Sequence, residues 1–335
     1  AGLTTAQLVS LSTTQMRGMT TTQLGGLDTV QVGGLSSTQI AALTNTQVGG
    51  LGSASIGVLS TAQIQGLTKQ QIAVLDVATQ VVGLTSTQIR VLTSTQESGL
   101  TTDQVAALST DQIAGLTAAQ IGNLSVRQTG SLTSTQISAL TTTQATGLSS
   151  GGLAQISVAQ LAGLQATQIA VLSVTQVKGL NSTQINGLTD AQVAGLTAAQ
   201  IASLTAAQER GLAATQIAVF TSTQIGALTT TQISALTTTQ EAGLTADQIA
   251  MFSAAQIGAL TVAQIQALDA NTQVSGLSAK TGLLTVAQAK ALEVADFASF
   301  SAAGIAGFTQ ADVNAWSTDQ RTAYTNAGGT KTKTA

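Results

Sequence analysis

Aliphatic and polar positions recur along this chain in a phrase of eight residues, Leu-Thr-x-x-Gln-Ile-x-x, which restarts from Leu3 to Trp316. The first and sixth positions are mostly aliphatic, the second is mostly Thr or Ser, and the fifth is Gln in most copies. A unit of eight residues is too small to bury its own apolar side chains, so it has to stack on neighbouring copies. The pattern therefore predicts a repeat solenoid.

The polar positions have the spacing of a helix capping box. When Ser or Thr is followed three residues later by Gln, each side chain can pair with a free backbone N–H group at the start of a helix. The aliphatic positions one and six have the spacing of the hydrophobic staple that accompanies such a start. Leu228-Thr229-Thr230-Thr231-Gln232-Ile233 carries the whole set. Each octad thus predicts a helix of about two turns.

A continuous helix and a continuous strand are both excluded. Eight residues at about 100° each overshoot two turns by roughly 80°, so the apolar stripe would wind around a long helix. In a strand, positions one and six would point to opposite faces. The chain must therefore turn once per octad. A β-solenoid with corners stays as the alternative because of the Thr-rich runs, although the abundance of Ala, Gln and Leu favours short helices.

Alternate octads differ at position six. Its aliphatic residue is replaced at Glu97, Thr129, Ala145, Glu209, Glu241 and Ala289, and consecutive replacements are separated by multiples of sixteen residues. This predicts a sixteen-residue coil of two helices, one with position six in the core and the other nearer an edge. Because a sealed core does not accept an ionised carboxylate, we expect the three Glu side chains at a solvated edge.

The same class of octads often carries Gly just before the next Leu, as at Gly99, Gly115 and Gly147. This fits a left-handed C-terminal helix cap or a close approach of two backbones. Two octads, which begin at Leu75 and Leu268, contain one extra residue and an Asp at the cap position. We expect these insertions to be loop expansions.

The repeat becomes aromatic after Glu293. Its aromatic residues are Phe297, Phe300, Phe308, Trp316 and Tyr324, in a chain with only 2% aromatic residues. This concentration predicts a C-terminal cap that closes the core, a contact with a next subunit, or both. We therefore expect a solenoid over residues 1–292, aromatic capping repeats over residues 293–326 and a flexible tail over residues 327–335.

Charged residues make up only 7% of the chain, against about a quarter in typical soluble domains. A surface of neutral Thr, Ser, Gln, Ala and Gly suits a molecule that assembles with copies of itself, because little charge keeps the copies apart. The net charge of -3 provides no basic patch for nucleic acid. Polar residues interrupt every apolar run, so we expect no membrane insertion.

The chain lacks the residues of several kinds of active site. It has no His and no Cys, which excludes Ser-His and Cys-His pairs and metal sites built on thiolate or imidazole. Glu97, Glu209 and Glu241 are separated by at least a whole coil, which argues against an acid–base pair of the glycosidase type. We therefore expect no enzymatic activity, no cofactor and no metal site.

The phrases Ile233-Ser234-Ala235-Leu236-Thr237-Thr238-Thr239-Gln240 and Val105-Ala106-Ala107-Leu108 resemble octapeptide arrays in large bacterial surface and secreted proteins of the adhesin-like exoprotein type. The resemblance implies an extracellular, structural role in bacteria. We expect a non-catalytic protein that polymerises into a filament or sheath, or that forms the stalk of an adhesin. The alternative is a binding module whose long face recognises a glycan, a surface, ice or a protein.

Overall fold

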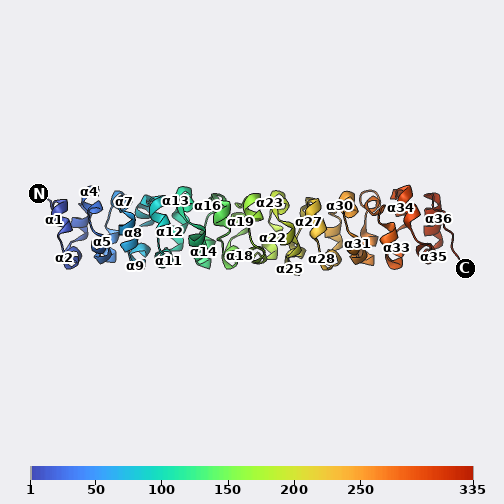
Figure 1. The fold of residues 1–335 in the computed structure, drawn as a ribbon, viewed down its shortest axis with the longest axis horizontal. Helices are drawn as coiled ribbons and strands as arrows, with labels where there is room; N and C mark the ends of the chain where they lie inside the picture. Colours follow the sequence, from blue (N-terminus) through green and yellow to red (C-terminus); the bar gives the residue numbers. More distant parts are fainter. Residues whose placement is uncertain (1, 335) are drawn as a thin grey trace. The chain divides into compact units, whose positions relative to one another are not determined.

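The octads fold into short helices that follow one another along the chain (Figure 1). The computed structural model describes residues 2–334, and this range contains helices and no strand. The all-α solenoid is confirmed, and the β-solenoid alternative is excluded. Residues 2–179 form one compact unit, and residues 180–334 form a second. The expected division into array, cap and tail stays a prediction.

The first unit contains the helices α1 (Thr5–Val9), α2 (Thr13–Gly18), α3 (Thr21–Gly25), α4 (Thr29–Gly33), α5 (Ser37–Ala42), α6 (Asn45–Gly49), α7 (Ser53–Gly57), α8 (Thr61–Gly66), α9 (Lys69–Ala73), η1 (Val77–Val81), α10 (Ser86–Arg90), α11 (Ser94–Glu97), α12 (Thr102–Ala107), α13 (Thr110–Gly115), α14 (Ala118–Asn123), α15 (Val126–Ser131), α16 (Ser134–Ser138), α17 (Thr142–Ala145), α18 (Ser150–Gln155), α19 (Val158–Leu161), α20 (Ala166–Ala170) and α21 (Val174–Lys178). The second unit contains α22 (Ser182–Asn186), α23 (Asp190–Gly195), α24 (Ala198–Ala202), α25 (Ala206–Gly211), α26 (Ala214–Ala218), α27 (Ser222–Ala227), α28 (Thr230–Ala235), α29 (Thr238–Glu241), α30 (Ala246–Ala250), α31 (Ala254–Ala259), α32 (Val262–Ala267), η2 (Val274–Leu277), η3 (Thr281–Leu283), α33 (Val286–Ala291), η4 (Val294–Ser299), α34 (Ala302–Gly307), α35 (Gln310–Ala315) and α36 (Thr318–Asn326).

Helix α13 shows how an octad starts and stops a helix. The hydroxyl of Ser109 accepts a hydrogen bond from the Gln112 backbone N–H at 3.2 Å, and the Gln112 side-chain oxygen accepts one from the Ser109 N–H at 2.7 Å. The predicted capping box is thus present. Leu116 is extended, with φ -68° and ψ 144°, so it ends the helix and leads into the next box.

Three helices, not two, make one turn of the coil. Within each unit, the helices that pack against each other lie three places apart in chain order, as α10 and α13 do. The Gln112 amide donates to the carbonyl of Leu84, and these residues hold positions five and one of octads that start three octads apart. One turn of the coil therefore takes three octads. The predicted coil of two helices and sixteen residues is wrong.

All three helices of a turn direct position six into the core. Ile113, Ile121 and Val105 occupy this position in consecutive helices and are completely buried, and Leu116 at position one is 5% exposed. The octads thus do not divide into an inner and an edge class at this position.

The glycines explain the alternation of octads. A Cβ atom on Gly115 would lie 2.6 Å from the Ser86 carbonyl oxygen in the preceding turn, and one on Gly147 would lie 2.1 Å from that of Ala118. The close approach of backbones is therefore confirmed. The left-handed cap is excluded, because only Gly328 has a positive φ among residues 2–334. Other octads carry Ala107 or Ala139 in place of this Gly, so we expect them to stack less closely on the turn before them.

The first insertion is absorbed at the start of a helix and not in a loop, whereas the second lies in turn residues 270–273 ahead of η2, as expected of a loop expansion. The Asp76 carbonyl accepts hydrogen bonds from both Gln80 and Val81 N–H groups at 2.9 Å, which produces the wider π turn of η1. The Asp269 carbonyl pairs in the same way with the N–H groups of Gln273 and Val274. The Asp side chains do cap these turns, as predicted.

Candidate functional site

The Gln side chains at position five connect successive turns of the solenoid. The side-chain oxygen of Gln104 accepts a hydrogen bond from the Thr101 N–H at 2.9 Å, which completes the capping box. Its amide nitrogen donates to the carbonyls of Ile72 at 2.9 Å and Leu75 at 2.8 Å. Carbonyls at a helix end lack a partner within the helix. The Gln104 amide supplies a partner for the Leu75 carbonyl from the next turn, and it adds a second donor to the Ile72 carbonyl, which also accepts the Leu75 N–H at 3.2 Å.

Sequence reasoning missed this second use of Gln. A capping box accepts Glu as readily as Gln at the fifth position, yet no octad of this chain has Glu there. Gln can donate through its amide while its oxygen caps the helix, whereas an ionised Glu can only accept. The consistent choice of Gln over Glu was therefore the signal for the connection between turns.

Glu97, Glu209 and Glu241 lie in the core, so the expected solvated edge is wrong. Their side chains are 1%, 4% and 1% exposed. Burial raises the pKa of Glu97, and it raises the pKa of Glu209 to about 7 and that of Glu241 to about 8. A sealed core does exclude an ionised carboxylate. However, these shifts allow the neutral carboxyl group to occupy the place of an Ile side chain.

Each of these Glu side chains has a different set of partners. The Asn123 amide donates to one oxygen of Glu97 at 3.0 Å. The charge of neighbouring Arg210 partly offsets the effect of burial on the pKa of Glu209. Neither carboxyl oxygen of Glu241 has a hydrogen-bond partner. Glu241 is thus the least compensated of the three.

The aromatic residues pack against one another inside the last turns. Phe297, Phe300, Phe308, Trp316 and Tyr324 are all buried. The Trp316 ring centroid lies 4.9 Å from that of Phe297 and 5.0 Å from that of Phe308, both edge to face. The Trp316 indole N–H donates to the Ala289 carbonyl at 2.8 Å. These rings fill the core here, so a contact with another subunit would have to use other side chains.

Two Asp side chains replace Gln in these aromatic turns. Asp296 accepts a hydrogen bond from the Glu293 N–H, and Asp312 accepts one from the Thr309 N–H, both at 2.7 Å. Burial raises the pKa of Asp296 to about 6. The tail follows α36 and lies against α35, where the Gln310 amide donates to the Thr332 carbonyl at 2.7 Å. Its expected flexibility stays a prediction.

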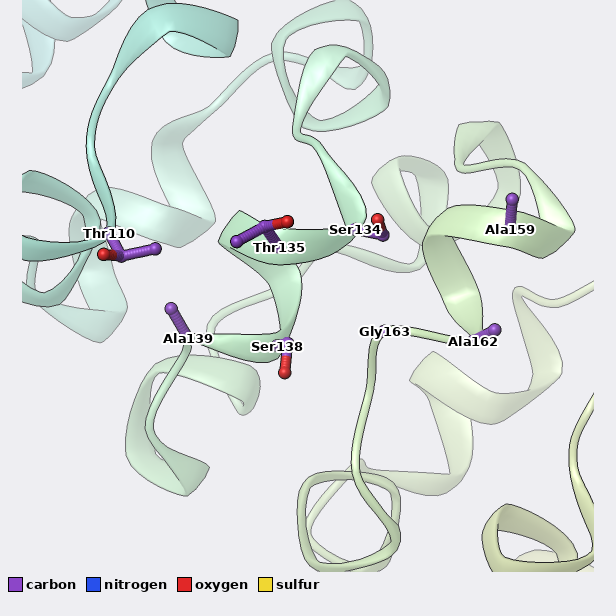
Figure 2. Close-up of a pocket in the computed structure, with 8 residues that line it drawn as sticks. All are labelled: Thr110, Ser134, Thr135, Ser138, Ala139, Ala159, Ala162 and Gly163. Carbon is purple, nitrogen blue, oxygen red and sulfur yellow. The ribbon is translucent and has the colours of Figure 1, made fainter.

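The outer surface has shallow grooves between stacked helices. One groove of about 660 Å³ runs along α13, α16 and α19. Figure 2 shows the eight residues that line it, which lie on these helices or directly after α16 and α19, with no charged group among them. They are Thr110, Ser134, Thr135, Ser138, Ala139, Ala159, Ala162 and Gly163. The groove offers hydroxyl and methyl groups in an open, regular setting.

Residues 2–334 contain no group of three or more carboxylate, His or Cys side chains arranged to hold a metal ion. Within the same range, no helix has the length and apolar character needed to cross a membrane.

Three stretches of the chain match the ALTTAQ repeat, over residues 14–45, 21–53 and 98–131. Each of these stretches spans about four octads. No curated protein matches the chain. The octads in these stretches are therefore similar to a recognised repeat.

Proposed function

We propose that the protein is a non-catalytic structural solenoid of the bacterial cell surface or extracellular space. It assembles with copies of itself into a filament or sheath, or forms the stalk of an adhesin. The observation that carries this proposal is the outer surface of small and hydroxyl-bearing side chains, as in the groove along α13, α16 and α19. The backbone groups between turns are paired by Gln104 and its equivalents, so this surface is free for contacts with other molecules.

The outer surface supports self-association. Only 7% of the residues are charged, and the groove along α13, α16 and α19 has no charged side chain. Charge normally keeps protein surfaces apart in solution. A surface with little charge and a regular series of helices permits many weak contacts between copies in one register. Such contacts favour long assemblies.

Electron microscopy and sedimentation of the purified chain over a wide range of concentrations test the proposal. We expect filaments or larger species to appear as the concentration rises. Thr135→Lys places a charge in the groove and should weaken assembly. Thr143→Lys is the matched control, because it introduces the same charge at the equivalent position of α17, which does not line this groove. A chain that stays monomeric at the highest concentration would refute self-assembly. Immunogold labelling of intact source cells tests the surface location.

A binding module is the second candidate, and the groove itself favours it. Thr110, Ser134, Thr135 and Ser138 contribute hydroxyl groups that could bind the hydroxyls of a glycan. Binding of the purified chain to a glycan array, abolished by Ser134→Ala together with Thr135→Ala, would favour this candidate. Thermal hysteresis measured on the same sample tests ice binding.

A further inference from the structure

Buried polar groups without a partner occur in two pairs outside the aromatic turns. Among residues 2–334, such atoms belong there to Glu97 and Thr129 in the first unit and to Glu209 and Glu241 in the second. The Gln128 amide donates to the Glu97 carbonyl at 2.9 Å, and the Gln240 amide donates to the Glu209 carbonyl at 2.7 Å. The residue after each Gln is the second member of the pair. Each pair therefore belongs to helices that one Gln connects from turn to turn.

The helices packed around the second pair are uncharged. Helix α25, which carries Glu209, packs against α22 and α28, and α29, which carries Glu241, packs against α26 and α32. None of these four helices contains an ionisable side chain. The charged neighbour on the same helices is the exposed Arg210. Other octads of this unit have a completely buried Ile, such as Ile233, at this position.

The first pair has more compensation. Helix α11, which carries Glu97, packs against α9 and α14. Helix α9 contributes the exposed Lys69, and α14 contributes the Asn123 amide that donates to Glu97. The pair in the second unit therefore has less support for ionisation, which comes from the charge of Arg210 beside Glu209 and not from any partner of the Glu241 carboxyl group.

We propose that Glu209 and Glu241 make the turns from α25 to α29 a pH-sensitive joint, which is closed when both carboxyl groups are protonated and opens locally when they ionise. A carboxylate without a cation or donor is strongly disfavoured in an apolar core. Opening lets water reach the charge, whereas the neutral carboxyl group is compatible with the closed turns.

The direction of the pH dependence follows from the raised pKa values. Below pH 4.5, the ordinary value for Glu, the carboxyl groups are protonated in both the closed and the open state. Above it, the open state releases protons that the closed state retains, so the closing constant falls by up to about tenfold per pH unit for each group. The loss ends near 7 for Glu209 and near 8 for Glu241, the pKa values of the closed state. Glu241 alone would then lower the closing constant roughly a thousandfold.

Hydrogen exchange of the full chain, measured by mass spectrometry at about pH 5 and about pH 8, tests the joint. Exchange times are scaled for the intrinsic effect of pH on amide exchange. We expect peptides over residues 206–241 to lose at least about tenfold in protection at the higher pH. Peptides over residues 37–66, which contain no buried carboxyl group, should keep their protection.

Three variants separate titration from a general weakening. Glu209→Gln combined with Glu241→Gln preserves side-chain size and should abolish the pH difference. Glu241→Ile, which introduces the residue found most often at the equivalent positions, should reduce it. Asp247→Asn removes an exposed carboxylate from α30 and should leave it unchanged. Equal protection of the native chain at both pH values, or a pH difference that persists in the double Gln variant, would overturn the proposal.

Discussion

Replacing Gly115 by Ala should destabilise the solenoid, although Ala is normally the better residue in a helix. Gly115 is the last residue of α13. The added Cβ would lie 2.6 Å from the Ser86 carbonyl oxygen and 2.8 Å from the Ser86 Cβ. Restoring an ordinary contact of 3.4 Å to that oxygen would require the two turns to separate locally by about 0.8 Å.

The expected cost combines two opposing effects. Overpacking of a tight contact typically costs about 1–3 kcal/mol, whereas replacing a helical Gly by Ala typically stabilises by roughly 0.5–1 kcal/mol. The net loss for Gly115→Ala should be about 1–2 kcal/mol. Gly18 is the last residue of α2, and a Cβ there meets nothing within 4 Å. Gly18→Ala should therefore stabilise by about 0.5 kcal/mol.

Urea unfolding followed by far-ultraviolet circular dichroism can compare these two variants with the native chain. A shift of the midpoint at constant slope reports a change in stability. We expect a lower midpoint for Gly115→Ala and an unchanged or higher midpoint for Gly18→Ala. If both variants shifted the midpoint upward by the same amount, the account of the alternating octads as close and loose contacts would be refuted.

Two other substitutions test the capping and connecting roles of the octad. Gln104→Leu removes the side-chain donor to the Leu75 carbonyl and leaves the Ile72 carbonyl with the Leu75 N–H, so it should cost about 1–3 kcal/mol in urea unfolding. Gln15→Leu should cost no more than about 1 kcal/mol, because the exposed Gln15 only completes its own capping box; equal losses would contradict the connection between turns. Helix α26 lacks a side-chain cap at Ala213, so Ala213→Ser should raise stability by about 1 kcal/mol in the same assay. An unchanged midpoint would contradict the capping argument.

The start and end of each helix could be predicted from the sequence because capping is local chemistry. Ser109, Gln112 and Leu116 interact within one octad or with the next, so their spacing along the chain is enough to identify their roles. The number of helices per turn is a different kind of information. It depends on which distant carbonyl accepts the hydrogen bond of the Gln112 amide. The sequence of the octad would be the same whether that carbonyl lay two or three helices away.

The alternation of octads was visible in the sequence, but its cause was not. Gly115 and Gly147 mark a close approach to the preceding turn, and octads with and without such a Gly, such as those that end at Gly115 and Ala139, can follow one another along one side of a coil of three helices. The same alternation suggested a coil of two helices when position six was interpreted as core or edge. The edge position predicted for Glu241 assumed an ionised carboxyl group, whereas burial raises the pKa of this group to about 8.

A cross-linking experiment tests the turn of three helices most directly. The chain has no Cys, so an engineered pair reports without background. A Cβ on Gly130 would lie 3.4 Å from the Cβ of Gln155, which belongs to the third octad further along the chain, and its closest contacts are with this residue alone. This separation is close to the range of natural disulfides, about 3.5–4.5 Å. Gly130→Cys with Gln155→Cys therefore joins α15 to α18.

Ser138→Cys with Gln155→Cys provides the matched control, because these positions would meet in a coil of two octads. Both double variants are oxidised under the same mild conditions, and peptide mapping by mass spectrometry identifies any disulfide. The three-helix turn predicts a disulfide between Cys at 130 and 155 and none between Cys at 138 and 155. The reverse result would contradict the coil of three octads and the Gln connections that define it.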